Sequence, residues 1–279
     1  MTTGAGLRGG ASCGLALAAV LLGAALPARA QDGAQDRAQD RAQDTQCTAP
    51  REAKSLEHAP IHFRERIAKG LPLKIVAIGS SSTFGTGASS PDKSYPSRLE
   101  AELKARLPGL PITVLNKGIG GEEAGQMVAR FDADVLDEAP DLVLWQVGSN
   151  SVLANHDAPG TIVHEGVERL KASGTDVILI NQQYAPKIID KGDLALHAVD
   201  AIAAAASDTG VGLFDRFATM RYWHDGENMG FDQFVTADGV HMNDWGYGCI
   251  AKLLAAELLD GTSRPAATAK VSATPTAIK

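Results

Sequence analysis

The chain lacks an excess of positive charge. Its 26 lysines and arginines stand against 33 aspartates and glutamates, for a formal net charge of −7. It has no basic patch, so neither a nucleic acid nor another polyanion is expected as a partner. Beyond residue 30 it also lacks any apolar run long enough to cross a bilayer. With 279 residues, 44% of them hydrophobic and 21% charged, it has no bias toward disorder or collagen-like repeats, and we expect one domain with a sizeable core.

The first thirty residues follow the pattern of a secretory signal peptide. Arg8 precedes an apolar stretch over 15–26, and Ala28-Arg29-Ala30 is a small-x-small cleavage site. We therefore expect residues 1–30 to be removed and the protein to be exported to the periplasm or the extracellular space. The formal charge then becomes −9, because this leader carries two basic residues and no acidic one. A retained membrane anchor is the competing interpretation, but the stretch is short for a span.

Two further segments have compositions typical of disorder. Residues 31–47 begin with a repeated Gln-Asp-x-Ala unit that has no apolar face, which predicts a disordered linker. Residues 263–279 are rich in Thr, Ala, Ser and Pro, which predicts a mobile tail and a folded domain over 48–262. Cys47 and Cys249 either form a disulfide, as an oxidising compartment allows, or remain one free and one buried cysteine.

Apolar runs alternate with amphipathic segments along the domain, which is typical of βα units that build a parallel sheet. Five strands are expected, at 73–79, 111–116, 141–147, 175–181 and 211–215. Helices are expected at 60–69, 94–107, 122–138, 160–173, 193–208 and 245–260. The predicted fold class is α/β, a three-layer α/β/α sandwich around a five-stranded parallel sheet with flavodoxin-like strand order.

Two short motifs, GSSSTFG at 79–85 and DGVH at 238–241, combine a nucleophile with a base. The first follows the first strand, so its serines lie at a carboxyl end, where open α/β sheets place their ligands. The second sets a carboxylate three residues ahead of an imidazole. One turn then presents both toward Ser81, with Asp238 holding the tautomer of His241 and His241 taking the serine proton.

The loops after the second and third strands reach the same rim of the sheet. They read NKGIGG at 116–121 and GSNS at 148–151. A glycine amide and an asparagine carboxamide are suitable donors to a developing oxyanion, and each such donor is worth about 3–4 kcal/mol of barrier in a well-studied protease. These residue types beside a serine indicate acyl transfer.

No metal or organic cofactor is expected. A P-loop needs a lysine after Gly85, which is absent, and the dinucleotide fingerprint fails because Glu123 occupies the third glycine position. His58 and His62 have the spacing of one helical face, but Pro60 lies between them and no strong third ligand is near.

In this order, the four blocks resemble the SGNH/GDSL hydrolase superfamily over most of residues 73–260. The resemblance implies a serine esterase or lipase that needs no cofactor. Its catalytic residues would be Ser81, Asp238 and His241. Its oxyanion hole would be formed by the amides of Ser81 and Gly121 and the side chain of Asn150.

Two positions depart from the family pattern. Ser80 stands where the family usually has aspartate, and Ser151 stands where the third block would place a second acid. The first departure leaves three adjacent serines, among which the spacing to Gly79 and Gly85 selects Ser81. The loss of two carboxylates also leaves open a hypothesis from another class, an exported carbohydrate-binding module that kept the fold without the chemistry.

The expected reaction is hydrolysis of a carboxylic ester through an acyl-enzyme. Export, the absence of a long apolar lid and the aromatic segment 221–231 favour acetyl esters on a carbohydrate, with Tyr222 and Trp223 as candidates for stacking on sugar rings. Packing of this segment onto the core is the alternative. A lysophospholipase, lipase or thioesterase stays open, as do an acyltransferase with the same triad and the oligomeric state.

Overall fold

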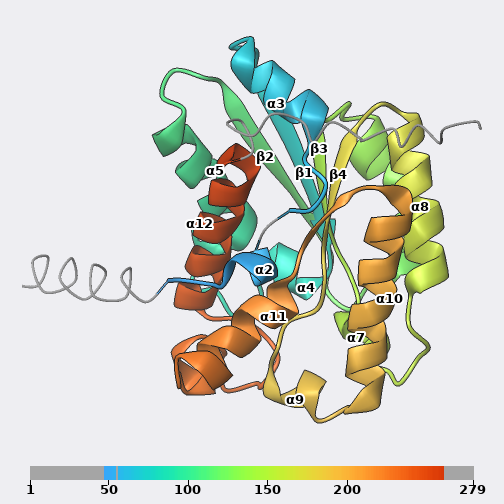
Figure 1. The fold of residues 1–279 in the computed structure, drawn as a ribbon, viewed down its shortest axis with the longest axis vertical. Coiled ribbons are helices and arrows are strands. Elements are labelled where there is room, and N and C mark those ends of the chain that lie inside the picture. The colour runs from blue at the N-terminus through green and yellow to red at the C-terminus, as the bar shows by residue number, and fades with distance from the viewer. Residues whose placement is uncertain (1–46, 55, 261–279) are drawn as a thin grey trace, which may run out of the picture. The chain divides into compact units, whose positions relative to one another are not determined.

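The computed structural model describes residues 47–54 and 56–260, so the predicted signal peptide, the predicted tail and nearly all of the predicted linker lie outside the described residues. Five parallel strands form one sheet in the order β2-β1-β3-β4-β5 (Figure 1). The strands are β1 (Leu73–Gly79), β2 (Ile112–Gly118), β3 (Leu142–Gln146), β4 (Asp176–Ile180) and β5 (Gly212–Phe214). The predicted fold class and the flavodoxin-like strand order are confirmed.

Helices connect the strands and cover both faces of the sheet. They are α2 (Arg51–Lys54), α3 (Ile61–Ala68), α4 (Ser81–Phe84), α5 (Tyr95–Arg106), α6 (Ala124–Ala129), α7 (Ser149–Leu153), α8 (Gly160–Ala172), α9 (Pro186–Ile189), α10 (Asp193–Thr209), α11 (Arg216–Arg221) and α12 (Asp244–Asp260). Short 3-10 helices span Pro91–Lys93 and Phe231–Gln233, and π-helical turns span Asp132–Leu136 and Tyr222–Gly226.

The single helix predicted over 122–138 is wrong. The segment forms α6 and then a separate π-helical turn, and the break falls at Arg130, which leaves helical geometry with φ −109° and ψ 11°. The Arg130 side chain donates to the carbonyl of Lys117 (2.8 Å) and to a carboxylate oxygen of Glu122 (2.8 Å). Arg130 therefore ends α6 and binds the end of β2, so the segment does not continue as one regular helix.

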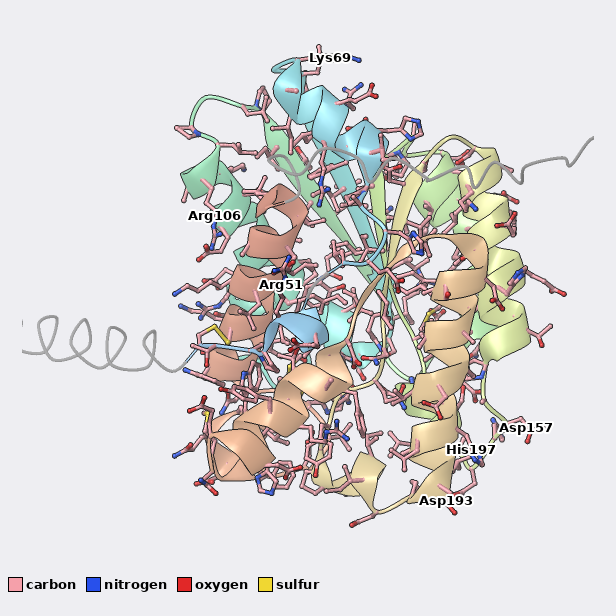
Figure 2. All side chains as sticks on the ribbon, viewed as in Figure 1. Arg51, Lys69, Arg106, Asp157, Asp193 and His197 are labelled. Carbon is pink, nitrogen blue, oxygen red and sulfur yellow. A yellow bond between two sulfur atoms is a disulfide. The ribbon has the colours of Figure 1, made fainter. Side chains whose placement is uncertain are left out.

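Side chains alternate between the two faces of the sheet and bury both. On β1, Ile75 and Ala77 join the core under α5 and α12, whereas Val76 and Ile78 join the core under α6, α8 and α10. Figure 1 shows α5 and α12 on one side of the sheet and α8 and α10 on the other. Charged side chains such as Arg106 project outward from this ribbon (Figure 2). Among the described residues, none of the helices combines the length and the apolar composition that a membrane crossing requires.

The ends of β1 and β2 close tightly around the helix that follows β1. A Cβ atom placed on Gly118, the last residue of β2, would lie 2.1 Å from the backbone nitrogen of Phe84 in α4. No side chain fits there, so glycine is required for β2 to pass beside α4. This close approach brings the loop after β2 to the serine-rich turn.

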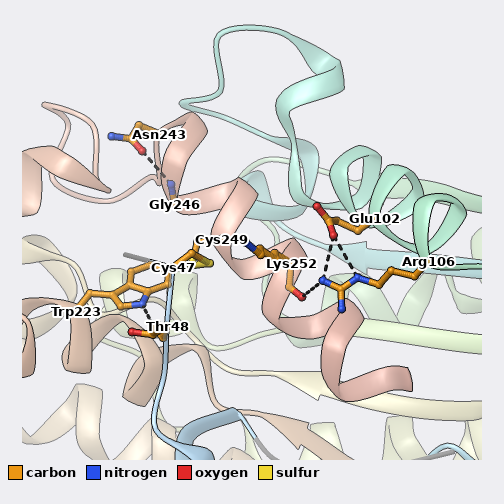
Figure 3. Close-up of a disulfide and its surroundings, with 9 residues drawn as sticks. All are labelled: Cys47, Thr48, Glu102, Arg106, Trp223, Asn243, Gly246, Cys249 and Lys252. Atoms are coloured by element: carbon orange, nitrogen blue, oxygen red, sulfur yellow. Dashed lines mark hydrogen bonds and ion pairs between the residues drawn. A yellow bond between two sulfur atoms is a disulfide. The ribbon is translucent and has the colours of Figure 1, made fainter. Parts of the chain in front are cut away.

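A disulfide joins Cys47 to Cys249 on α12 (Figure 3), which confirms the first of the two alternatives for these cysteines. Their Cα atoms lie 5.4 Å apart, although 202 positions separate them in sequence. Next to the bridge, Trp223 Nε1 donates to the carbonyl of Thr48 (2.8 Å). The bridge fastens the start of the domain to α12, the helix that follows DGVH, and the hydrogen bond fastens it to the π-helical turn at 222–226.

We predict that Cys47→Ser lowers the free energy of unfolding by about 2–5 kcal/mol, because the bridge closes a long loop and restricts the unfolded chain. Urea denaturation of the oxidised full chain, wild type against variant, measures the difference. Wild-type protein treated with a reductant is the control and should unfold at the urea concentration that unfolds the variant. Equal midpoints for the variant and the oxidised wild type would contradict the prediction.

Candidate functional site

The structure separates the three adjacent serines by their partners. Ser80 is buried and its hydroxyl donates to Gln146 Oε1 (3.0 Å), and Ser82 is buried and its hydroxyl donates to Gln183 Oε1 (3.4 Å). Ser81 is partly exposed, and its Oγ lies 2.8 Å from Nε2 of His241. Of the three hydroxyls, Ser81 alone reaches an imidazole among the described residues.

Asp238 and His241 form one turn. Asp238 Oδ2 lies 2.6 Å from His241 Nδ1, and Asp238 Oδ1 accepts the backbone N–H groups of Val240 (2.8 Å) and His241 (2.9 Å). Burial by itself would raise the pKa of Asp238, but the hydrogen bonds from the His241 ring and from these two amides outweigh it and lower the pKa. Since Asp238 is ionised, Nδ1 of His241 carries a proton and Nε2 is free to accept the proton of Ser81.

The predicted oxyanion donors lie at the same rim. Ser81 is the first residue of α4, and the first amides of a helix have no acceptor within the helix. A Cβ atom placed on Gly120 would lie 3.9 Å from Cβ of Ser81, so the loop after β2 passes directly beside the serine. Gly121 follows with φ +83°, in the left-handed region that favours glycine.

Asn150 is tied to this loop. Its Nδ2 donates to the carbonyl of Glu122 (2.7 Å), which leaves the second N–H of the carboxamide for another acceptor. This hydrogen bond holds the loop that carries Gly121 close to the start of α7. The structure therefore brings five of the seven residues singled out from the sequence, the proposed triad and the two further proposed donors, to one rim of the sheet.

A carboxylate from another segment accepts a hydrogen bond from Ser151. Ser151 Oγ donates to Oε2 of Glu123 (3.1 Å), and the other oxygen of Glu123 lies 2.9 Å from Nδ1 of His156. The Ser80 hydroxyl and amide both donate to Gln146 Oε1 at 3.0 Å. At both positions that depart from the family pattern, the serine hydroxyl therefore has a hydrogen-bond acceptor.

The expectation that Trp223 contacts substrate is wrong, because its side chain is fully buried. Its ring makes edge contacts with Phe234 (5.5 Å between centroids) and Trp245 (4.9 Å), as the packing alternative requires. The hydroxyl of Tyr222 is hydrogen-bonded to Glu227, and Tyr222 lines a depression that includes no member of the triad. The aromatic segment packs onto the core.

Two exposed apolar side chains that the sequence interpretation did not single out flank the serine. Phe84 is 62% exposed and lies three residues after Ser81 in α4, a spacing that puts both on one helical face. Ile119 is 46% exposed and precedes Gly120 in the loop after β2. Both belong to the motif blocks, but their exposure depends on the fold.

Two depressions adjoin the site. One of about 580 Å³ includes Gly87, where an added Cβ would lie 3.0 Å from Cβ of His241. The other, of about 920 Å³, includes Glu123, Ser151 and His156, beside Asn150. Among the described residues, no group of three His, Cys, Asp or Glu side chains is placed to hold a metal ion.

Comparison with known proteins places the chain in a family. The non-GDSL lipase-like family matches residues 46–264, and the chain belongs to it. The predicted membership of the SGNH/GDSL-like hydrolases is thereby confirmed. An acetylxylan esterase from Geobacillus stearothermophilus is 36% identical over 81 residues, which cover 29% of this chain and 34% of the relative, so the match spans about a third of that protein.

Solved structures share the fold. A two-domain esterase active on acetylated mannans, co-crystallised with mannopentaose, matches 77% of this chain and 57% of its own length, with TM-score 0.65 and 22% identity. A variant of the Geobacillus stearothermophilus acetylxylan esterase matches 68% of this chain and 95% of its own, with TM-score 0.58 and 21% identity. Three structures of that enzyme are described as catalytic mutants, each with alanine in place of a serine, an aspartate or a histidine. In its sequence the aspartate lies three positions before the histidine.

We predict that the rate at which Ser81 reacts with a serine-directed fluorophosphonate falls at acidic pH, and that the logarithm of this rate plotted against pH has a slope of one. His241 must be neutral to accept the serine proton, and Asp238 stays ionised because its pKa is lowered, so a single protonation governs the loss. Labelling rates across an acidic to neutral pH series measure the slope. A flat profile, or a slope of two, would contradict the arrangement.

Proposed function

We propose that the protein is an exported serine esterase that removes acetyl groups from a carbohydrate. The observation that carries the proposal is the continuous hydrogen-bond chain from Ser81 Oγ through the ring of His241 to Asp238, with distances of 2.8 and 2.6 Å. The acetylxylan and acetylated-mannan esterases that the chain resembles support the substrate class. The leader pattern and the disulfide support an oxidising compartment outside the cytosol.

The first half of the proposed reaction acylates the serine. His241 Nε2 takes the proton of Ser81 while Oγ attacks the ester carbonyl carbon, and the Asp238 carboxylate stabilises the imidazolium. The carbonyl oxygen becomes an oxyanion that accepts hydrogen bonds from the oxyanion donors, which are the amides of Ser81 and Gly121 and the side chain of Asn150. The bond to the sugar oxygen then breaks, and the imidazolium gives its proton to that oxygen.

The second half releases the acid. Water attacks the acyl carbon and loses a proton to His241, and a second oxyanion forms in the same place. Collapse of this intermediate breaks the bond to Ser81, whose oxygen takes the proton back from His241. Acetic acid leaves, and the triad returns to its starting protonation state without a metal or redox step.

The open rim favours a short acyl group on a bulky alcohol. Ser81 is partly exposed, and neither of the two depressions beside the triad includes Ser81 in its lining. An acetyl group needs little apolar surface, whereas a long acyl chain needs a continuous apolar channel. The exposed surface around Ser81 leaves room for a polymer to lie across the rim.

We predict that activity on p-nitrophenyl esters falls as the acyl chain lengthens from acetate. We also predict that Ser81→Ala lowers kcat at least about a thousandfold. Initial rates on the ester series measure both effects. Thermal unfolding of Ser81→Ala provides the control for its fold. A preference for long acyl chains would favour a lipase or lysophospholipase, and a folded wild type that neither turns over esters nor reacts with fluorophosphonate would favour a carbohydrate-binding module.

We propose that Phe84 contacts the sugar, since it is the large exposed apolar side chain on the face of α4 that presents Ser81. Phe84→Ala should raise KM for acetylated xylooligosaccharides about three- to tenfold through the loss of ring stacking. Turnover of ethyl acetate, which has no sugar ring, should stay unchanged. Leu196→Ala is the matched control, because Leu196 is also exposed (48%) but lies on α10. An unchanged KM for the oligosaccharide in Phe84→Ala would reject this role.

A further inference from the structure

Three carboxamide side chains follow β4 in succession, at 181–183, and all three are buried. The last of them contacts three segments of the site. Gln183 Oε1 accepts hydrogen bonds from the hydroxyls of Ser149 (2.7 Å) and Ser82 (3.4 Å) and from Nη2 of Arg216 (2.9 Å), while Gln183 Nε2 donates to the carbonyl of Val240 (3.1 Å). Ser82 follows the proposed nucleophile, Ser149 precedes the oxyanion asparagine and Val240 precedes the proposed base, so one side chain links all three.

Arg216 explains how the Gln183 amide is oriented. Arg216 is the first residue of α11, its side chain is fully buried, and its Nε donates to the carbonyl of Asn181 (3.0 Å). Burial lowers the pKa of Arg216 to about 10, so it still carries its charge at neutral pH. A guanidinium only donates, so the amide oxygen of Gln183 must face it and the amide N–H groups must face Val240.

Burial of the Arg216 charge costs free energy, which supports a role for this side chain in organising the site. Burying an arginine carries a large desolvation penalty unless its donors are satisfied. No described carboxylate forms an ion pair with Arg216, and its Nη1 has no hydrogen-bond partner among the described residues. The acceptors that it does have are the Asn181 carbonyl and the Gln183 amide, at the carboxyl end of β4.

Three successive backbone carbonyls of the DGVH turn, at 239–241, accept hydrogen bonds that hold the turn in place. Gly239 accepts the amide of Lys187 (3.0 Å), and His241 accepts the amide of Thr236 (2.8 Å). Between them, the Val240 carbonyl accepts the side chain of Gln183, which stands at the end of the central sheet. This bond ties the position of the imidazole to the sheet that also positions Ser81.

We infer that Gln183, oriented by Arg216, is a positioning residue that holds the His241 turn in register with Asn150 and Ser81. The inference rests on the proposed function. Gln183 does not touch the reacting atoms and acts through the Val240 carbonyl and the hydroxyls of Ser149 and Ser82. A displacement of reacting groups by about 1 Å can cost a hundredfold in rate, so one lost bond to this turn is enough to matter.

Two variants of Gln183 remove the bond to Val240 in different ways. Gln183→Met keeps the length without polar atoms, and Gln183→Glu keeps acceptors for Arg216 and Ser149 but loses the N–H donor. We expect both to lower kcat about ten- to a hundredfold with KM unchanged, and to slow fluorophosphonate labelling in parallel. Gln182→Met is the matched control, because Gln182 is equally buried but donates to the carbonyl of Ala195 in α10 (2.7 Å), and it should keep kcat within about threefold.

The outcomes separate this inference from the proposed function. If the folded Gln183 variants keep wild-type kcat and labelling, or if KM rises while kcat holds, the positioning role is rejected and the esterase proposal stands. If both variants unfold while Gln182→Met folds, Gln183 supports the fold and not the base, and the role is again rejected. If wild-type protein is not labelled at Ser81, the proposed function fails and this inference falls with it.

Discussion

The hydrogen bond between Ser81 Oγ and His241 Nε2, 2.8 Å long, joins positions 160 apart and needs both of them at the same edge of one sheet. Parallel strands provide this edge, because every carboxyl end points the same way. Further contacts close the two segments on each other. Asp244, at the start of α12, accepts the amide of Ser89 (2.8 Å), and the hydroxyl of Tyr247 donates to a carbonyl of the same loop (2.6 Å). These contacts hold the loop after α4 against the start of α12, on either side of the hydrogen bond between Ser81 and His241.

The parts that could be predicted from the sequence are those that local patterns encode. Strands buried on both faces are continuous apolar runs, and β1 has the predicted bounds, Leu73–Gly79. β2 extends two residues beyond the prediction, because its polar end keeps pairing with β1 up to Gly118. The contact between Asp238 and His241 is also local, since the carboxylate bonds to the backbone and the ring three residues later, which the spacing alone indicates.

The parts that could not be predicted depend on contacts between distant segments. Nothing near Trp223 in sequence shows that its ring packs between Phe234 and Trp245, and nothing near Phe84 shows that its ring is exposed. Gln183 likewise gains its importance from Arg216, 33 positions away. Motif spacing identifies residues that bond within one turn, whereas exposure and long-range hydrogen bonds follow only from the packing of helices and loops.

The two serines that depart from the family pattern, Ser80 and Ser151, have hydrogen-bond partners suited to a hydroxyl. The oxygen of Gln146 accepts hydrogen bonds from both the amide and the hydroxyl of Ser80 in a buried position. Ser151 in turn donates to Glu123, which supplies a carboxylate from the loop after β2. Each serine is therefore paired with a partner that suits a hydroxyl. The site depends on where donors and acceptors lie, so losing the family's carboxylates does not by itself imply lost chemistry.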